Sequence, residues 1–473
     1  MKMFMNGDWV ERDSQIEVVN PYDGDAFDTV PEATTDDITA AVDGLVEGAK
    51  VMRKMSALQR CEILRKAAKL LCEKEDEIGR IISTEEGKIL PEGKLEVTRA
   101  AETIDVSADE ARRLTGEVLP LDAAPGGVGK FGFTLRVPVG IVAAITPFNF
   151  PLNLVAHKVG PAIAGGNAVL IKPATDTPLS ALKLVEVLLE AGLPPEAIAC
   201  VTGPGSSIGA AICAEDRIRK ISFTGSAEVG KAICAAAGLK RVTMELGSNS
   251  PLIVLDDADL EKVAMATVAT GFANAGQVCI SCQRVIATEG IHDNLLDELQ
   301  PRVTALTAGD QLAEGTNVGP LVREGDASRV ADWVAEAAGN GARLLCGGER
   351  NGSVVQPALL ADVRPDMRLS CDELFGPAVG VTRAANIDEA IALANDTNYG
   401  LSAGIFTENL KAALRFAHEV ESGNLHINWG PMWRADFMPY GGLKDSGLGK
   451  EGPKYAIQEM TETKMVVIHG KSP

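Results

Sequence analysis

The amino-acid sequence predicts an α/β protein in which a doubly wound parallel sheet is joined to a second α/β domain. Between residues 139 and 256, short runs rich in β-branched residues alternate with longer Ala- and Leu-rich segments. This alternation is typical of repeated βαβ units. A second block of the same kind starts near residue 250, and 473 residues are enough for about two or three domains.

The first block is expected to contain five strands and four helices. The strands are predicted at 140–146, 168–172, 197–202, 220–224 and 242–246, and the helices near 152–164, 178–191, 206–214 and 226–237. Most of these strands end where a Gly, Pro, Thr or Ser opens the next helix. Because nucleotides bind at the carboxyl ends of such strands, we expect a Rossmann-like nucleotide-binding domain.

Three further segments flank or follow this block. Residues 35–104 show apolar positions at helical spacing and are expected to pack on the nucleotide domain. Residues 116–138 change to strand alternation around a turn at 124–127, which predicts a β-hairpin, and the β-rich run 464–469 is expected to pair with it, in its own or another subunit. In the second block, a helix is expected at 324–341 and a strand at 378–382.

Charge and hydropathy exclude several classes of partner. Forty-five basic and sixty-five acidic residues give a net charge of -20, which opposes binding to nucleic acid or to an anionic membrane. The most apolar stretch, 137–147, is too short to span a bilayer, and the first residues lack the apolar core of a signal peptide. We therefore expect a cytoplasmic protein with no nucleic-acid or membrane partner.

The nine cysteines do not form a disulfide framework, because they are odd in number and spread through a long chain. Cys279 and Cys282 lack a second Cys or His pair at zinc-ligand spacing, so no metal site is predicted. The pair is left with three interpretations: a redox dithiol, a nucleophile with a bystander, or two buried thiols.

Two strand-to-helix turns are candidates for binding dinucleotide phosphates through backbone N–H groups. They are V-T-G-P-G-S-S-I-G at 201–209 and F-T-G-S at 223–226. Lys172 puts a cation at the carboxyl end of another strand. The alternatives are ordinary turns and a solvated lysine.

Asn149 and Glu245 are candidate catalytic residues. Asn149 lies between an apolar strand and a proline-bounded helix start, where its amide can donate to a developing oxyanion. Glu245 lies within an apolar run, where desolvation raises a carboxyl pKa toward that of a general base. A turn asparagine and a paired structural glutamate are the alternatives.

Taken together, these segments resemble the aldehyde dehydrogenase superfamily over nearly the whole chain. The motifs that carry the resemblance stand in family order: P-F-N-F-P at 147–151, L-I-K-P-A at 170–174, F-T-G-S at 223–226, M-E-L-G at 244–247, G-Q-V-C at 276–279, E-L-F-G-P at 373–377 and P-Y-G-G-L-K-D-S-G-L-G at 439–449. The chain is most similar to members that act on lactaldehyde, on glyceraldehyde 3-phosphate without phosphorylation, or on succinate semialdehyde.

The resemblance implies an NAD(P)-dependent oxidation of an aldehyde to its acid. Cys279 would attack the aldehyde, Asn149 and the Cys279 N–H would hold the oxyanion, and Glu245 would activate the water that hydrolyses the thioester. Members that transfer the acyl group to coenzyme A usually lack this glutamate, so Glu245 favours hydrolysis. The other readings are a non-catalytic relative, a CoA-acylating enzyme and a dithiol redox protein.

The resemblance also assigns the cofactor-binding residues. They are Ile145, Thr146, Pro147, Phe148, Lys172, Ala174, Thr175, Gly203, Phe223, Thr224, Gly225, Ser226, Val229, Leu246, Gly247, Glu373 and Phe375. Thr175 stands where NAD-specific members often carry a glutamate, so NADP is expected alone or beside NAD. Asp176, the next residue, argues the other way.

For the substrate, the resemblance points to Arg99, Phe150, Arg434 and Phe437. The two arginines suggest a small anionic or hydroxylated aldehyde, although structural salt bridges would also explain them. The chain departs from family patterns at Ser248, often a glycine, and at Val278, an arginine in members that oxidise phosphorylated aldehydes.

The expected domains follow from the same resemblance. Residues 1–115 and 139–247 form the NAD(P)-binding domain, 248–438 the catalytic domain with the nucleophile, and 116–138 with 439–473 the oligomerisation arm and tail. A homodimer or homotetramer is expected.

Overall fold

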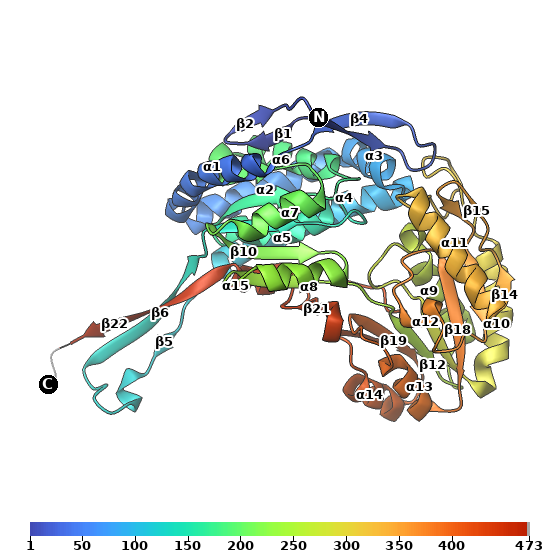
Figure 1. Cartoon of the computed structure of the whole chain (residues 1–473). Helices are drawn as coiled ribbons and strands as arrows, with labels where there is room; N and C mark the ends of the chain where they lie inside the picture. Colours follow the sequence, from blue (N-terminus) through green and yellow to red (C-terminus); the bar gives the residue numbers. More distant parts are fainter. Residues whose placement is uncertain (471–473) are drawn as a thin grey trace.

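The computed structural model describes residues 1–470 and contains two large sheets and a projecting three-stranded arm (Figure 1). The first sheet has the order β2-β1-β9-β8-β7-β10-β11-β21. Its parallel centre consists of β7 (Ile141–Ile145), β8 (Ala168–Lys172), β9 (Ile198–Cys200), β10 (Ile218–Thr224) and β11 (Arg241–Glu245). The five predicted strands are therefore confirmed, and the α/β fold class with them.

Antiparallel strands extend both edges of this sheet. They are β1 (Met3–Met5), β2 (Asp8–Val10) and β21 (Gly447–Leu448). The sequence analysis predicted none of the strands in the first 31 residues, which also include the hairpin β3 (Gln15–Val19) and β4 (Ala26–Pro31). Strands this short carry little periodic signal.

Helices cover both faces of the first sheet. They are α1 (Thr35–Lys54), α2 (Ala57–Glu73), α3 (Glu75–Glu86), α4 (Leu90–Arg113), α5 (Asn153–Ala164), α6 (Leu179–Ala191), α7 (Gly205–Ala214) and α8 (Ala227–Ala236). Alternate residues of β7 enter two separate cores: Val142 and Ala144 pack with α2, α4, α5 and α6, whereas Ile141 and Ala143 pack with α1, α7 and α8. This division follows from the two-residue period of a strand buried on both faces.

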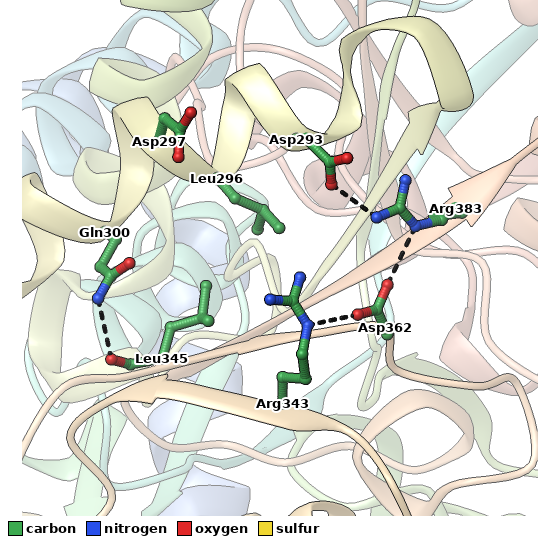
Figure 2. Close-up of a pocket in the computed structure, with 8 residues that line it drawn as sticks. All are labelled: Asp293, Leu296, Asp297, Gln300, Arg343, Leu345, Asp362 and Arg383. Carbon is green, nitrogen blue, oxygen red and sulfur yellow. Dashed lines mark hydrogen bonds and ion pairs between the residues drawn. The ribbon is translucent and has the colours of Figure 1, made fainter.

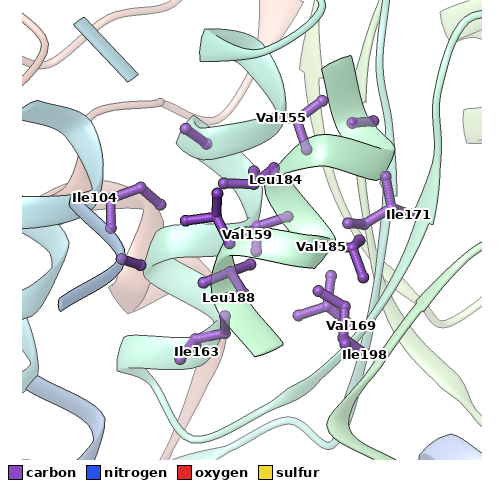
Figure 3. Close-up of a cluster of buried hydrophobic side chains, with 14 of the residues drawn as sticks. Ile104, Val155, Val159, Ile163, Val169, Ile171, Leu184, Val185, Leu188 and Ile198 are labelled. Atoms are coloured by element: carbon purple, nitrogen blue, oxygen red, sulfur yellow. The ribbon is translucent and has the colours of Figure 1, made fainter. Parts of the chain in front are cut away.

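Figure 3 shows the first of these cores. Side chains of α5 and α6, such as Val159 and Leu184, lie against Val169 and Ile171 of β8, with Ile104 of α4 on the far side. The core anchors α5, and it thereby positions the Asn149 segment at the start of that helix.

The second sheet has the order β14-β17-β18-β13-β12-β19-β20. Its strands are β12 (Pro251–Val254), β13 (Arg284–Thr288), β14 (Arg343–Cys346), β17 (Ala358–Ala361), β18 (Ala378–Ala384), β19 (Ser402–Phe406) and β20 (Asn424–Ile427), of which only β14 is antiparallel. Its helices are α9 (Leu260–Gly271), α10 (Glu289–Thr304), α11 (Glu324–Gly339), α12 (Arg368–Cys371), α13 (Ile387–Asn395) and α14 (Leu410–Glu419). The expected helix near 324–341 and strand near 378–382 are both present.

The arm consists of β5 (Val118–Leu119), β6 (Lys130–Pro138) and β22 (Thr461–His469), which follows α15 (Pro453–Glu459). β22 pairs with β6 along its whole length, from Thr461 opposite Pro138 to His469 opposite Lys130, so the tail joins the hairpin of its own chain. The arm points away from both sheets (Figure 1). It exposes apolar side chains, with Val118 70 %, Phe131 52 % and Ile468 53 % accessible.

Within residues 1–470, no helix combines the length and the apolar character needed to cross a membrane.

Candidate active site

Most of the predicted cofactor residues lie at one edge of the first sheet, where its parallel strands end, whereas Val229 lies in the first turn of α8 and Glu373 and Phe375 lie in the loop before β18. Ile145 ends β7 and residues 146–148 follow it; Lys172 ends β8, with Ala174 and Thr175 after it. Gly203 follows β9, residues 223–226 span the end of β10, and Leu246 and Gly247 follow β11. The chain runs outward from β7 to β9 and then crosses to β10 on the other side of β7. Such a reversal of strand order opens a crevice at the carboxyl ends of the strands, which is where ligands bind in open α/β sheets.

Several polar atoms in this crevice are available to a ligand. Thr146 Oγ1 is buried and has no hydrogen-bond partner among the described residues. Lys172, 3 % exposed, donates from Nζ to the Pro173 carbonyl at 2.8 Å, and burial lowers the pKa of its ammonium to about 8, against the opposing effect of Asp176. The Ser226 hydroxyl caps α8 by accepting from Val229 N at 3.4 Å. A buried ammonium and an orphaned hydroxyl fit a nucleotide with hydroxyl and phosphate groups.

Asp176, the residue whose charge argued against NADP, has a partner in the structure. Its carboxylate forms a two-pronged ion pair with Arg323, one contact of which measures 2.9 Å. The Thr175 hydroxyl donates to the Gly203 carbonyl at 3.2 Å. The negative charge of Asp176 is thus neutralised by a neighbouring arginine.

Glu373 and Phe375 reach the crevice from the second sheet. Glu373 Oε1 accepts from Ser248 N at 2.9 Å, and its other carboxylate oxygen would lie 2.3 Å from a Cβ added to Gly247. Burial raises the pKa of Glu373 to about 7. The rings of Phe375 and Phe148 meet edge to face at 5.8 Å, so the loop before β18 meets the segment after β7 at the crevice.

The loop before Cys279 has an unusual backbone. Asn274, Ala275 and Gly276 all have positive φ, at 49°, 52° and 71°. A Cβ on Gly276 would lie 2.1 Å from the Gly376 carbonyl, so only glycine fits there. The Asn274 amide holds the loop by donating to Glu86 at 2.9 Å and to the Asn149 carbonyl at 3.2 Å.

Asn149 lies beside the same loop. Its side-chain Nδ2 donates to the Gln277 carbonyl at 2.8 Å, two residues before Cys279, and leaves one amide hydrogen for another acceptor. Its own carbonyl accepts from Lys88 Nζ at 2.6 Å, and Lys88 pairs with Glu96 at 2.7 Å. The buried Lys88–Glu96 ion pair therefore holds the backbone of Asn149 in place.

Cys279 and Glu245 share this site. The Cys279 Sγ lies 3.2 Å from the Tyr440 hydroxyl, and burial raises the pKa of the thiol to about 12. Glu245 ends β11, is 3 % exposed, and neither of its carboxylate oxygens has a hydrogen-bond partner in the described part of the chain. Burial raises the pKa of Glu245 well above its usual range, and the negative charge of Glu451 raises it further. An unpaired buried carboxylate is poised to accept a proton.

Cys282 has a different environment. It is fully buried in the core beneath the second sheet, and its N–H donates to the Thr270 carbonyl at 3.0 Å. Of the three interpretations of the Cys279–Cys282 pair, this buried environment favours those in which Cys282 is a packing residue.

Arg434 and Arg99 both have protein partners. Arg434, 7 % exposed, contacts Glu451 at 3.2 Å and His157 Nδ1 at 3.1 Å, while Arg99 grips Asp436 with contacts of 3.1 and 2.9 Å. The Arg434 Nε atom has no partner within residues 1–470. The two apolar residues predicted for the substrate site have different surroundings. The Phe150 ring centre lies 4.0 Å from Lys88 Nζ, whereas Phe437 is 58 % exposed.

His157 connects the two arginines. Because Arg434 can only donate, Nδ1 must accept and Nε2 must carry the hydrogen, which it donates to Asp436 at 2.9 Å. Burial lowers the pKa of His157 to about 4, and the charge of Arg434 lowers it further, so the ring is neutral near pH 7. For Asp436, burial is outweighed by His157 and Arg99, which keep the pKa of its carboxyl below the usual range.

The sequence analysis missed His157, Lys158, Asp436, Tyr440 and Glu451. Lys158 is fully buried and bonds Glu451 and the Thr224 hydroxyl, each at 2.6 Å. A signal for two of them existed, because His157 and Lys158 interrupt an otherwise apolar helix, L-N-L-V-A-H-K-V-G. The other three lie in loops with no such contrast.

A second hollow lies elsewhere, between α10 and the edge of the second sheet. Figure 2 shows this cavity of about 460 Å³, in which Arg343 and Arg383 flank Asp362. Asp362 accepts from them at 2.7 and 3.0 Å, and Arg383 also contacts Asp293 at 2.6 Å. Its arginines are already paired, and none of the predicted site residues lines it.

Residues 9–466 match the model of the aldehyde dehydrogenase family. The 3-sulfolactaldehyde dehydrogenase of Priestia megaterium is 44 % identical, with 99 % of this chain and 98 % of the relative covered. The lactaldehyde dehydrogenase of Methanococcus aeolicus is 39 % identical, with 99 % and 100 % covered.

A solved structure supports the same assignment. The NADP-dependent glyceraldehyde-3-phosphate dehydrogenase of Bacillus halodurans, crystallised with NADP, superposes with a TM-score of 0.97 at 37 % identity, covering 99 % of each chain. The family match spans almost the entire sequence. The chain therefore belongs to the aldehyde dehydrogenase family and is an oxidoreductase that acts on aldehydes with NAD or NADP.

Proposed function

We propose that the protein oxidises a small aldehyde to its carboxylic acid through a covalent intermediate on Cys279. The observation that carries this proposal is the buried Glu245 carboxylate, whose oxygens lack hydrogen-bond partners in the described structure and whose charge acts on the Cys279 thiol. A structural glutamate in an apolar environment would be paired. A nucleophile beside an unpaired base is the arrangement that acyl transfer to water requires.

In the first half of the reaction, Cys279 loses its thiol proton to solvent, its thiolate sulfur bonds to the aldehyde carbon, and the carbonyl oxygen becomes an oxyanion. The second amide hydrogen of Asn149 and the Cys279 N–H stabilise this charge. NAD or NADP, when bound, supplies the acceptor for the hydride that the carbon loses. Loss of the hydride leaves a thioester on Cys279.

In the second half, Glu245 takes a proton from water as the water oxygen bonds to the thioester carbon. The carbon–sulfur bond then breaks, releasing the acid and the thiolate. The raised pKa of Glu245 makes it a stronger base than an exposed carboxylate. Lys158 of α5 and Glu451 form a buried ion pair near Glu245, in which the charge of Glu451 raises the pKa of Glu245 and the charge of Lys158 lowers it.

A purified sample assayed against a panel of aldehydes with each cofactor tests the proposed reaction. We expect reduction of the cofactor to be accompanied by one equivalent of acid, with no requirement for coenzyme A. Acid formation that requires coenzyme A would contradict the hydrolytic role given to Glu245.

For the cofactor, we propose that Lys172 and Thr175 bind the adenosine ribose and its 2′ substituent, with Glu373 and Phe375 at the nicotinamide end. The first sheet, with residues 1–115 and 139–247, would then be the NAD(P)-binding domain, and 248–438 the catalytic domain. The Arg323–Asp176 ion pair leaves the ribose end of the crevice without a free carboxylate from Asp176, which supports use of NADP.

Replacing Thr175 with glutamate tests this assignment. The new carboxylate would stand beside Lys172 and repel a 2′-phosphate, so kcat/KM for NADP should fall about tenfold or more while that for NAD changes little. Steady-state kinetics with both cofactors give the ratio, and Thr175→Gln is the neutral control of similar size. An equal loss with both cofactors would remove Thr175 from the ribose site.

For the substrate, we propose a small anionic or hydroxylated aldehyde. Arg434 is the buried cation whose charge acts on Cys279, and its Nε–H is unclaimed among the described residues. Relatives with similar sequences are named for 3-sulfolactaldehyde and lactaldehyde, both short hydroxylated aldehydes. A sulfonate, carboxylate or phosphate could accept from Arg434, with Arg99 nearer the surface.

Replacing Arg434 with glutamine should lower kcat/KM for an anionic aldehyde about 10- to 100-fold more than for a neutral aldehyde of similar length, since one charge-assisted hydrogen bond is lost. Comparing succinate semialdehyde with butanal in the same variant cancels any general damage to the site. Arg99→Gln is the parallel variant. An unchanged ratio in both would assign these arginines to the protein's own ion pairs.

For assembly, we propose that the arm of β5, β6 and β22 joins subunits into a homodimer or homotetramer. The exposed apolar side chains along it, including Val118 and Phe131, support this role.

A further inference from the structure

Tyr440 directs its hydroxyl at the sulfur of Cys279. The two atoms lie 3.2 Å apart, and Tyr440 is only 3 % exposed. Its ring packs in a small apolar cluster with Val278, Ile280 and Leu401. The hydroxyl is therefore shielded from water and held against the sulfur.

The position of Tyr440 is set by a contact of its backbone and a contact of its ring. Its backbone forms a bridge with Glu451, with N–H to carbonyl distances of 3.2 and 2.7 Å in the two directions. The guanidinium carbon of Arg434 lies 4.0 Å from the centre of its ring, and Arg434 is itself paired with Glu451. A cation over the ring is attracted by the negative face of the ring quadrupole. The charge of Arg434 also lowers the pKa of Tyr440, which strengthens its hydroxyl as a hydrogen-bond donor.

The chemistry of the pair decides which atom donates. Burial raises the pKa of Tyr440 well above its usual value, and the neighbouring Cys279 and Glu245 raise it further, so the phenol keeps its hydrogen. A cysteine that attacks a carbonyl does so as thiolate, which has no hydrogen to give. Once Cys279 is ionised, the hydrogen bond can run only from Tyr440 to the sulfur.

The environment of Cys279 shifts the pKa of its thiol in both directions. Burial, the largest effect, raises the pKa of the thiol, and the carboxylates of Glu373 and Glu245 raise it further. The hydrogen bond with Tyr440 and the charge of Arg434 lower it. Tyr440 and Arg434 thus both favour the reactive thiolate, and of the two it is Tyr440 that contacts the sulfur directly.

We propose that Tyr440 is a catalytic residue that donates its phenol hydrogen to Cys279, favouring the thiolate and holding the sulfur in position for attack. This inference rests on the proposed function, because it matters only if Cys279 is the nucleophile. Tyr440 makes and breaks no covalent bond; the hydrogen stays on its oxygen.

The test is the pH dependence of Cys279 alkylation by iodoacetamide in the full-length protein without added cofactor, followed for the Cys279 peptide by mass spectrometry. Tyr440→Phe keeps the ring and its contact with Arg434 but removes the hydroxyl. We expect alkylation near pH 7 to slow about tenfold and the midpoint of the profile to rise by about one pH unit. Tyr455→Phe, which removes a hydroxyl in α15, is the matched control and should leave the profile unchanged.

An unchanged midpoint in Tyr440→Phe would overturn the proposal. So would a rate reduced equally below and above the midpoint, since that result would mean that the ring only packs beside the sulfur. Alkylation reads the thiol itself and does not depend on turnover. Failure of the proposed function would appear instead as dehydrogenase activity that survives the loss of Cys279.

Discussion

Replacing Cys279 with alanine is expected to lower kcat/KM for every aldehyde by about 10,000-fold or more, because the step that forms the thioester has no other nucleophile. The bound cofactor and the oxyanion donors would remain, so the variant should still bind NAD or NADP. Initial rates of cofactor reduction and a binding titration measure the two effects separately.

Cys282→Ala is the matched control for this experiment. Cys282 lies in the core below the second sheet, so its loss should cost about 1 kcal/mol or less in stability and leave turnover close to normal. If Cys282→Ala lost activity as severely as Cys279→Ala while remaining folded, a dithiol mechanism would replace the one proposed.

Replacing Glu245 with glutamine is expected to separate the two halves of the reaction. Glutamine has a similar shape but cannot take a proton, so hydrolysis of the thioester should slow by about 100- to 10,000-fold. The first turnover does not need the base, and a burst of about one reduced cofactor per site should precede a slow steady rate. Rapid-mixing spectroscopy measures the burst, and intact-protein mass spectrometry should detect the acyl group on Cys279.

The same residue predicts a pH dependence. Only the ionised carboxylate can act as the base, and burial raises the pKa of Glu245, so the rate of hydrolysis should increase with pH above the usual carboxylate range. Glu245→Gln should lose this rise. The exposed Glu47→Gln should keep it. If Glu245→Gln lost the burst of reduced cofactor as well as the steady rate, Glu245 would act in the first half of the reaction instead.

Much of the site was predictable because its signals are local. Asn149, Glu245 and the turns at 203 and 223–226 each stand where an apolar strand ends, and a strand end is visible within a few residues of sequence. The βαβ pattern likewise repeats over short windows, and β7, β8, β9, β10 and β11 were found close to their observed bounds. The short strands β1 and β2 were missed because strands this short carry little periodic signal, and because β1 is held in the sheet by a distant segment, with Phe4 opposite Cys200.

The roles of the substrate arginines depend on contacts that no local pattern contains. Arg434 and Arg99 look alike in the sequence, yet one is buried against Glu451 and His157 while the other lies partly exposed on Asp436. His157 stands 277 positions from Arg434, and Asp436 stands 337 positions from Arg99. Which hydrogen-bonding atoms remain free for a substrate is therefore a property of the packed structure.

Residue order and periodicity predicted the α/β architecture, and the family resemblance pointed to Cys279, Asn149 and Glu245 as the candidate reacting groups. Packing established the environment in which they act. The Cys279–Tyr440 contact joins residues 161 positions apart, and the His157–Asp436 contact joins residues 279 positions apart. Burial, pairing and pKa arise from such long-range neighbours, and these neighbours exist only after the two sheets have closed over the same crevice.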